Sequence, residues 1–111
     1  MKRYAAISAD IVTSTSLSAI GLSELAKSIR KLLIDLEMNY EGFWGRLVKG
    51  DSIECIVPHP ENALRIALIL KSCVKSFVPT DGQSSSKFKQ FGLRLVIGVG
   101  DMRINSKWIS S

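Results

Sequence analysis

Two aspartates at the ends of two predicted strands are the residues of this sequence whose type and spacing could do chemistry. Asp10 lies in residues 8–12 (SADIV), and Asp51 follows Gly50 in residues 48–52 (VKGDS). Carboxylates that are brought together repel one another unless a proton or a cation lies between them. If the fold brings these two residues to one end of a sheet, the pair therefore needs a proton or a cation between the carboxylates.

A structural role is the alternative for both aspartates. An aspartate beside a tight turn commonly stabilises that turn, and Asp10 could do so for the hydroxyl-rich residues 13–18. Arg46, Lys49 and Arg94 could instead neutralise the carboxylates as ion pairs. The residue pattern leaves both interpretations open.

The size and composition of the chain are those of one globular domain. Its 111 residues, 46% of them apolar, suffice for a single core, and the charged fraction of 23% is ordinary for a globular domain. No apolar run approaches the roughly 20 residues that span a bilayer. We expect the basic start not to be a signal peptide, because Ser8 and Asp10 interrupt its apolar segment. We therefore expect a cytoplasmic protein without a membrane partner.

The net charge of +5 does not predict nucleic-acid binding. The lysines and arginines are spread over two predicted helices and a loop and form no stripe, so we expect no nucleic-acid partner for this segment. Cys55 and Cys73 belong to no CxxC motif, and His59 is the single histidine. This set does not predict zinc binding, and we expect two reduced thiols.

Hydrophobic periodicity predicts four strands and two helices in the order β-α-β-β-α-β. Strands are expected at residues 4–12, 43–49, 52–57 and 91–99. Helices are expected at residues 24–40 and 60–77. Ser23 is a plausible N-cap of the first helix, and Gly50 suits a tight hairpin because it tolerates positive φ.

The chain reads as one domain with a polar insertion. Residues 1–104 form the expected domain, and residues 79–90, which are rich in serine and lysine, are expected to form a mobile loop within it. Residues 105–111 are expected to be a tail, whose abrupt end is consistent with truncation of a longer protein and also with a complete small protein.

This order of elements is that of the split β-α-β, or ferredoxin-like, α+β fold. Its usual sheet is antiparallel in the order 4-1-3-2, with both helices on one face. The first and third strands are then neighbours, which places Asp10 next to Asp51. The alternation of residues leaves Tyr4, Ile56 and Val96 on the open face of the sheet, where they would form a dimer or partner surface.

The same motifs resemble those of class III nucleotide cyclases. Residues 9–15 (ADIVTST) look like the first-strand metal motif, and residues 49–57 (KGDSIECIV) look like the hairpin motif. Residues 62–68 and 93–101 resemble the helix and the strand that follow. In length and in its opening strand the chain is similar still more closely to the SatD-like family, and the resemblance covers about residues 4–104.

The resemblance implies a metal and phosphate site. Asp10 and Asp51, assisted by the backbone carbonyl of Ile11, would hold Mg²⁺ or Mn²⁺. The amides of the following loop would bind the phosphates of a nucleotide; these residues are Val12, Thr13, Ser14, Thr15 and Ser16. Mg²⁺ commonly takes one or two protein carboxylates together with phosphate oxygens, and a loop that leads into a helix offers free N–H donors.

The sequence departs from active cyclases at two of these positions. Thr13 stands where cyclases usually have a glycine, and Leu47 stands where they have the lysine that selects the base. The transition-state asparagine and arginine of cyclases lie beyond the fourth strand and have no counterpart here. We therefore expect a sensory or regulatory domain that binds metal and nucleotide without cyclase activity. The alternative is a non-catalytic regulatory or dimerisation module that has lost the ligand.

Overall fold

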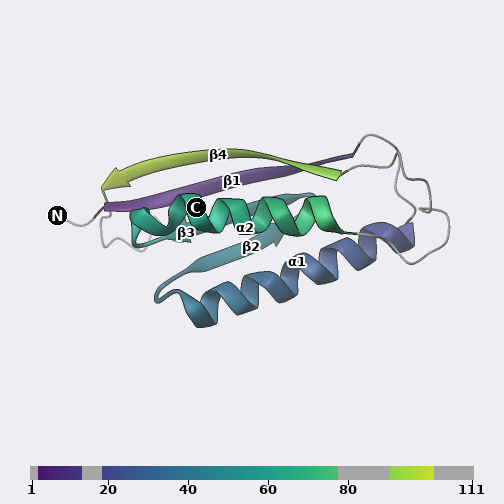
Figure 1. The fold of residues 1–111 in the computed structure, drawn as a ribbon, viewed down its shortest axis with the longest axis horizontal. Helices are drawn as coiled ribbons and strands as arrows, with labels where there is room; N and C mark the ends of the chain where they lie inside the picture. The colour runs from purple at the N-terminus through teal and green to yellow at the C-terminus, as the bar shows by residue number, and fades with distance from the viewer. Residues whose placement is uncertain (1–2, 14–18, 78–90, 102–111) are drawn as a thin grey trace.

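A computed structural model describes residues 3–13, 19–77 and 91–101. The described strands are β1 (Arg3–Thr13), β2 (Trp44–Val48), β3 (Ser52–Val57) and β4 (Phe91–Asp101). The helices are α1 (Ala19–Asn39) and α2 (Ala63–Ser76), and a short 3₁₀ turn at Pro60–Asn62 leads into α2. The elements follow one another in the predicted order, and the chain has an α+β fold (Figure 1).

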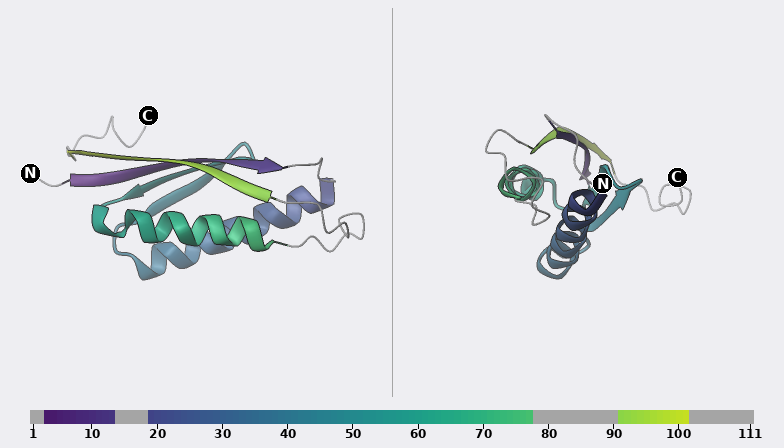
Figure 2. Two further views of the ribbon diagram at one scale, coloured as in Figure 1. Left: turned by 45° about the horizontal axis from the view of Figure 1, so that its top comes forward. Right: turned by 90° about the vertical axis from the view of Figure 1, so that its right-hand side faces the viewer.

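The four strands form one antiparallel sheet in the order β2-β3-β1-β4. This is the predicted order 4-1-3-2 read from the opposite edge. Both helices pack on the same face of the sheet, α1 beside β2 and α2 beside β1 and β4 (Figure 2). The other face of the sheet is left open by the described elements, as the alternation of residues predicts.

The core lies between the sheet and the two helices. The odd-numbered residues of β1 and β3 point to the helices, and Ile7 and Ile53 are fully buried there. The helices contribute Leu25, Ile29, Leu33 and Leu36 from α1 and Ile66, Ala67, Leu70 and Val74 from α2. Burial of each large apolar side chain contributes about 1.5–3 kcal/mol, so this single layer of contacts holds the domain together.

The helix boundaries differ from the predicted ones at the start of α1. The helix begins at Ala19 rather than at residue 24, and Ser23 is an exposed residue inside it, so the N-cap prediction is wrong. Gly21 is buried one turn before Leu25, which shows that α1 packs against its neighbours from its first turn. Tertiary packing here outweighs the weak helix propensity of glycine and serine.

The predicted mobile loop at residues 79–90 lies outside the described residues. No helix in the described part of the chain is long and apolar enough to cross a membrane.

Gly45 in β2 marks the closest approach of α1 to the sheet. A Cβ at this position would lie 2.8 Å from Cδ2 of Leu33 and 2.8 Å from Cε2 of Phe43, and both side chains are buried. We expect Gly45→Ala to lower the free energy of unfolding by about 1–3 kcal/mol in a denaturant titration, because both neighbours must shift.

Gly98→Ala is the matched control, because a Cβ there would meet nothing within 4 Å. Its free energy of unfolding should stay level or rise slightly. Equal losses in the two variants would contradict the close packing at Gly45.

Candidate functional site

The hairpin between β2 and β3 turns sharply before Asp51. Lys49 and Gly50 have φ values of 57° and 79°. Glycine adopts such values freely, so the predicted role of Gly50 is confirmed, whereas a lysine adopts them at a cost in free energy. Because Lys49 lies in the turn, the alternation of the strand does not fix the face to which its side chain points.

This turn brings Asp51 beside β1. The backbone N–H of Ile11 donates a hydrogen bond of 2.9 Å to the carbonyl oxygen of Asp51. The next pair of the ladder joins Asp10 and Ser52. The predicted proximity of Asp10 and Asp51 is therefore confirmed for their backbones.

The register nevertheless sets the two aspartates one residue apart. Asp51 lies opposite Ile11, and in a regular strand a shift of one residue would place its side chain on the opposite face of the sheet from Asp10. Asp51 precedes the first residue of β3 and belongs to the turn, so its side chain is not held to that alternation. The carboxylates can meet at the end of the sheet only through this turn geometry.

Asp10 is exposed on the open face, between two polar neighbours. The hydroxyl of Ser52 donates a hydrogen bond of 3.1 Å to Oδ1 of Asp10. Arg94 of β4 is its register partner on the other side, but within the described ranges no ion pair joins Arg94 to Asp10. Because an ionised carboxylate has about four acceptor sites, Asp10 can still accept from a ligand or coordinate a cation.

Glu54 adds a third carboxylate to this region, which the sequence analysis did not include in the site. The hydroxyl of Ser8 donates a hydrogen bond of 2.7 Å to Oε1 of Glu54. Glu54 and Asp10 lie on diagonal positions of neighbouring strands, and such Cα atoms are about 7–8 Å apart. The period-two alternation of β3, which puts Glu54 on the open face, is the signal that could have identified it.

The described carboxylates do not form a complete metal-binding site by themselves. Among the residues that the structure describes, no group of three or more His, Cys, Asp or Glu side chains is placed to hold a metal ion. A cation at Asp10 and Asp51 would need oxygen atoms from a ligand to complete its shell.

The predicted phosphate-binding segment is described only at its start. Val12 and Thr13 belong to β1 and pair with Gly92 and Phe91 of β4, so the strand runs one residue further than expected. The other residues of the segment, Ser14, Thr15 and Ser16, lie outside the described residues. Their predicted role in phosphate binding stays a prediction.

The residues predicted to form an interface lie on the open face. Ile56 pairs with Ala6 of β1 and with Trp44 of β2, and Tyr4 packs against Gly100. Sequence analysis missed Trp44, whose ring lies 5.0 Å from the guanidinium carbon of Arg46. The open face therefore has an apolar end around Ile56 and an acidic end around Asp10.

Val96 shares the open face with these residues. It lies opposite Ser8, between the apolar and the acidic ends, and is exposed.

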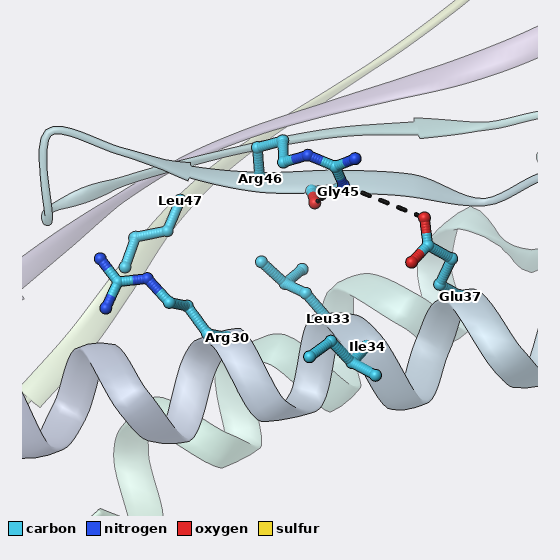
Figure 3. Close-up of a pocket in the computed structure, with 7 residues that line it drawn as sticks. All are labelled: Arg30, Leu33, Ile34, Glu37, Gly45, Arg46 and Leu47. Atoms are coloured by element: carbon cyan, nitrogen blue, oxygen red, sulfur yellow. Dashed lines mark hydrogen bonds and ion pairs between the residues drawn. The ribbon is translucent and has the colours of Figure 1, made fainter.

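A groove separates α1 from β2 on the helix side of the sheet. It has a volume of about 330 Å³ and is lined by Arg30, Leu33, Ile34, Glu37, Gly45, Arg46 and Leu47 (Figure 3). Nη1 of Arg46 lies 4.0 Å from Oε1 of Glu37 and donates to the carbonyl of Gly45 at 2.7 Å. Arg46 thus contacts Glu37 of α1 instead of neutralising Asp10 or Asp51.

Leu47 lines this groove and is turned away from the face that carries Asp10. At the position where the resemblance to cyclases predicts the counterpart of the base-selecting lysine, this chain places an apolar side chain toward α1. It has no hydrogen-bonding group there for a nucleotide base.

Comparison with models of known protein families and with curated proteins finds no match for this chain. The resemblance to SatD-like proteins and to nucleotide cyclases therefore stays a prediction from the motifs.

Proposed function

We propose that this chain is a ferredoxin-like domain of the cyclase-like palm type that binds a divalent metal together with the phosphates of a nucleotide. Its role is sensory or regulatory rather than catalytic. The observation that carries the proposal is the hydrogen bond of 2.9 Å from the N–H of Ile11 to the carbonyl of Asp51. This contact joins the two aspartate-bearing motifs at one end of the sheet, where Asp10 is exposed.

The donor set suits Mg²⁺ or Mn²⁺ shared with phosphate oxygens. Mg²⁺ keeps several waters and usually takes one or two protein carboxylates plus oxygens of a phosphate. Asp10 and Asp51 supply that number of carboxylates, and the carbonyl of Ile11 would be the third protein ligand. We therefore expect the metal to bind much more weakly alone than together with a nucleotide.

A regulatory role is favoured over catalysis by the chemistry that surrounds the two aspartates. Leu47 provides no selection of the base, and Thr13 hinders close approach of the backbone to phosphates because it is β-branched. A domain that binds a nucleotide loosely can report its concentration to a partner.

Calorimetric titration with MgATP and MgGTP tests the proposal. We expect saturable binding by the wild-type chain and at least a tenfold weaker affinity for Asp10→Asn and for Asp51→Asn, which is about 1.4 kcal/mol. The loss follows because each amide removes one negative charge from the metal shell. Titration with Mg²⁺ alone should give little heat.

Asp35→Asn is the matched control, because Asp35 is an exposed carboxylate on α1. It changes the net charge equally and should leave binding unchanged. Equal heats in the wild type and both site variants, or no binding at millimolar nucleotide, would refute the proposed function.

A second candidate function is that of a ligand-free module that dimerises through its open face. The observation that favours it is the apolar end formed by Trp44, Ile56 and Tyr4 on that face. In this case Ile56→Lys would weaken self-association, and no nucleotide would bind.

A further inference from the structure

In the described part of the chain β4 is an edge strand, and its second half lacks the residues that usually protect such an edge. Among the described strands it pairs with β1 alone, and it is 11 residues long. Residues 95–100 (LVIGVG) contain neither a charge nor a proline. Natural sheets normally guard a long edge with lysines, prolines or a short strand, because an unguarded edge pairs with another strand. The outer edge of β4 is therefore suited to accept one.

The helix side of β4 also exposes apolar side chains that the alternation would bury. Ile97 and Val99 lie opposite the fully buried Ile7 and Ala5, yet they are 38% and 59% exposed. Leu93, near the start of the same strand, is buried. The helix layer thus covers the beginning of β4 and leaves its second half open.

α2 carries a matching apolar surface at the same border of the molecule. Leu64 and Leu68 are 64% and 54% exposed. α2 runs antiparallel to β4 (Figure 2). Its buried residues belong to the core between the sheet and the two helices. In a right-handed helix with this course, Leu64 and Leu68 lie on the side next to the outer edge of β4. Both layers of the domain therefore end in exposed apolar groups at one border.

We propose that this border, which consists of the outer edge of β4 and of Leu64 and Leu68 on α2, pairs with the same border of a second copy of the chain. β4 would pair with β4 of the partner in antiparallel fashion, and the two α2 helices would lie side by side beneath the joined sheet. A second copy is the occupant that fits, because the partner must supply both an unpaired strand and an apolar helix below it. A two-fold axis perpendicular to the sheet provides both at once.

The pairing has a defined register. A two-fold axis of this orientation keeps the helices of both copies on one face of the joined sheet. Residues that lie opposite each other must then share a face, so odd-numbered residues of β4 pair with odd-numbered ones and even-numbered with even-numbered ones. An axis at Ile97 pairs this residue with its own copy and pairs Leu95 with Val99. It also sets Val96 opposite Gly98 on the open face. The apolar side chains on the helix side then form one continuous row across the axis.

The helix layer is consistent with the same axis. α2 begins near the end of β4, because Val57, which precedes α2, and Val99 both pair with Ala5. Ile97 lies about 7 Å along the strand from Val99, and this distance covers about five residues of a helix, which leads from Ala63 to Leu68. The axis at Ile97 therefore passes near Leu68.

Charge on α2 complements itself in this arrangement. Glu61 lies just before the helix, and Lys71 and Lys75 lie in its second half. Antiparallel packing of two α2 helices around Leu68 brings Glu61 of one copy level with Lys75 of the other, while Arg65 in the first turn of α2 is exposed. Such complementarity favours this self-pairing over parallel or offset contacts.

Sedimentation equilibrium over a wide range of concentration tests the proposal. The wild-type chain should form a dimer, and Leu68→Glu and Ile97→Lys should each weaken its dissociation constant at least tenfold. Ile56→Lys is the matched control, because Ile56 lies in β3 on the open face, away from the outer edge of β4. It should leave the dimer intact. Circular dichroism would establish that each variant is folded, and Leu68→Glu changes only an exposed helix position.

Two outcomes would overturn the proposal. A monomeric wild type at every concentration would do so, whether β4 is left unpaired or is covered by another segment of the chain. Dissociation by Ile56→Lys but not by Leu68→Glu would instead assign self-association to the open face. Neither outcome bears on nucleotide binding, which the calorimetric variants test separately.

Disulfide trapping tests the register itself. Residues that face each other directly in an antiparallel pair have Cα atoms about 4.5–5.5 Å apart, which a disulfide can bridge. In a Cys73→Ser background, Ile97→Cys should form a covalent dimer on oxidation that reductant reverses. Val96→Cys should not form a covalent dimer, because residue 96 faces Gly98 of the second copy and the two cysteines would be two residues apart along the strand. The opposite pattern would refute an axis at Ile97.

Discussion

Ile7→Ala is expected to lower the free energy of unfolding by about 2–5 kcal/mol. Ile7 is fully buried in β1, between Cys55 of β3 and Ile97 of β4, and its side chain faces the helix layer. Truncation leaves a cavity that the surrounding strands can fill only partly. A domain of this size has only about 5–15 kcal/mol of stability in total, so the loss is severe. Denaturant unfolding followed by circular dichroism measures it.

Ile34→Ala provides the control for this experiment. Ile34 is an exposed isoleucine on α1, so the same truncation there should change the free energy of unfolding by at most about 0.5 kcal/mol. A similar loss in the two variants would contradict the position of the core between sheet and helices.

The second large effect is expected at alkaline pH and comes from Cys55. Burial, with a smaller contribution from the charge of Glu54, raises the pKa of the Cys55 thiol from 9.0 to about 12. In the unfolded chain the thiol ionises near pH 9, whereas in the folded chain it stays protonated until about pH 12. The folded state therefore binds more protons in this window, and its stability is complete below pH 9 and falls as the pH rises.

Between pH 9 and about 12 the free energy of unfolding should fall by about 1.4 kcal/mol for each pH unit because of this thiol. Denaturant titrations of the wild type and Cys55→Ala across this window measure the difference, since other titrating groups affect both proteins alike. Burial also raises the pKa of Cys73, and this contribution is common to both. Parallel pH profiles of the two proteins would contradict the burial of Cys55.

The alternation of apolar residues predicts much of the fold, because it reports which side of each strand faces a core. The buried row of Ile53, Cys55 and Val57 in β3 follows directly from it. The order of the elements then leads to the sheet order and to the proximity of Asp10 and Asp51. Each of these features depends on local pattern and on the few ways of pairing four short strands.

The features that the sequence analysis missed depend on packing between elements. Gly21 and Ser23 are poor helix formers, and α1 includes them because the helix packs from its first turn. Leu47 and Gly45 line a groove whose existence depends on how closely α1 approaches β2. No period in the sequence encodes that distance.

The acidic motifs and the end of β4 show which features the sequence pattern determines and which depend on tertiary packing. The sequence by itself determines that the segments of Asp10 and Asp51 are neighbours in the sheet, since strand order follows from the pattern of elements. Only the tertiary structure decides that Asp51 lies opposite Ile11, because a tight turn and not the period of a strand sets its register. Likewise, the alternation marks Ile97 and Val99 as inward-facing, yet their side chains are exposed because the described helices do not cover them.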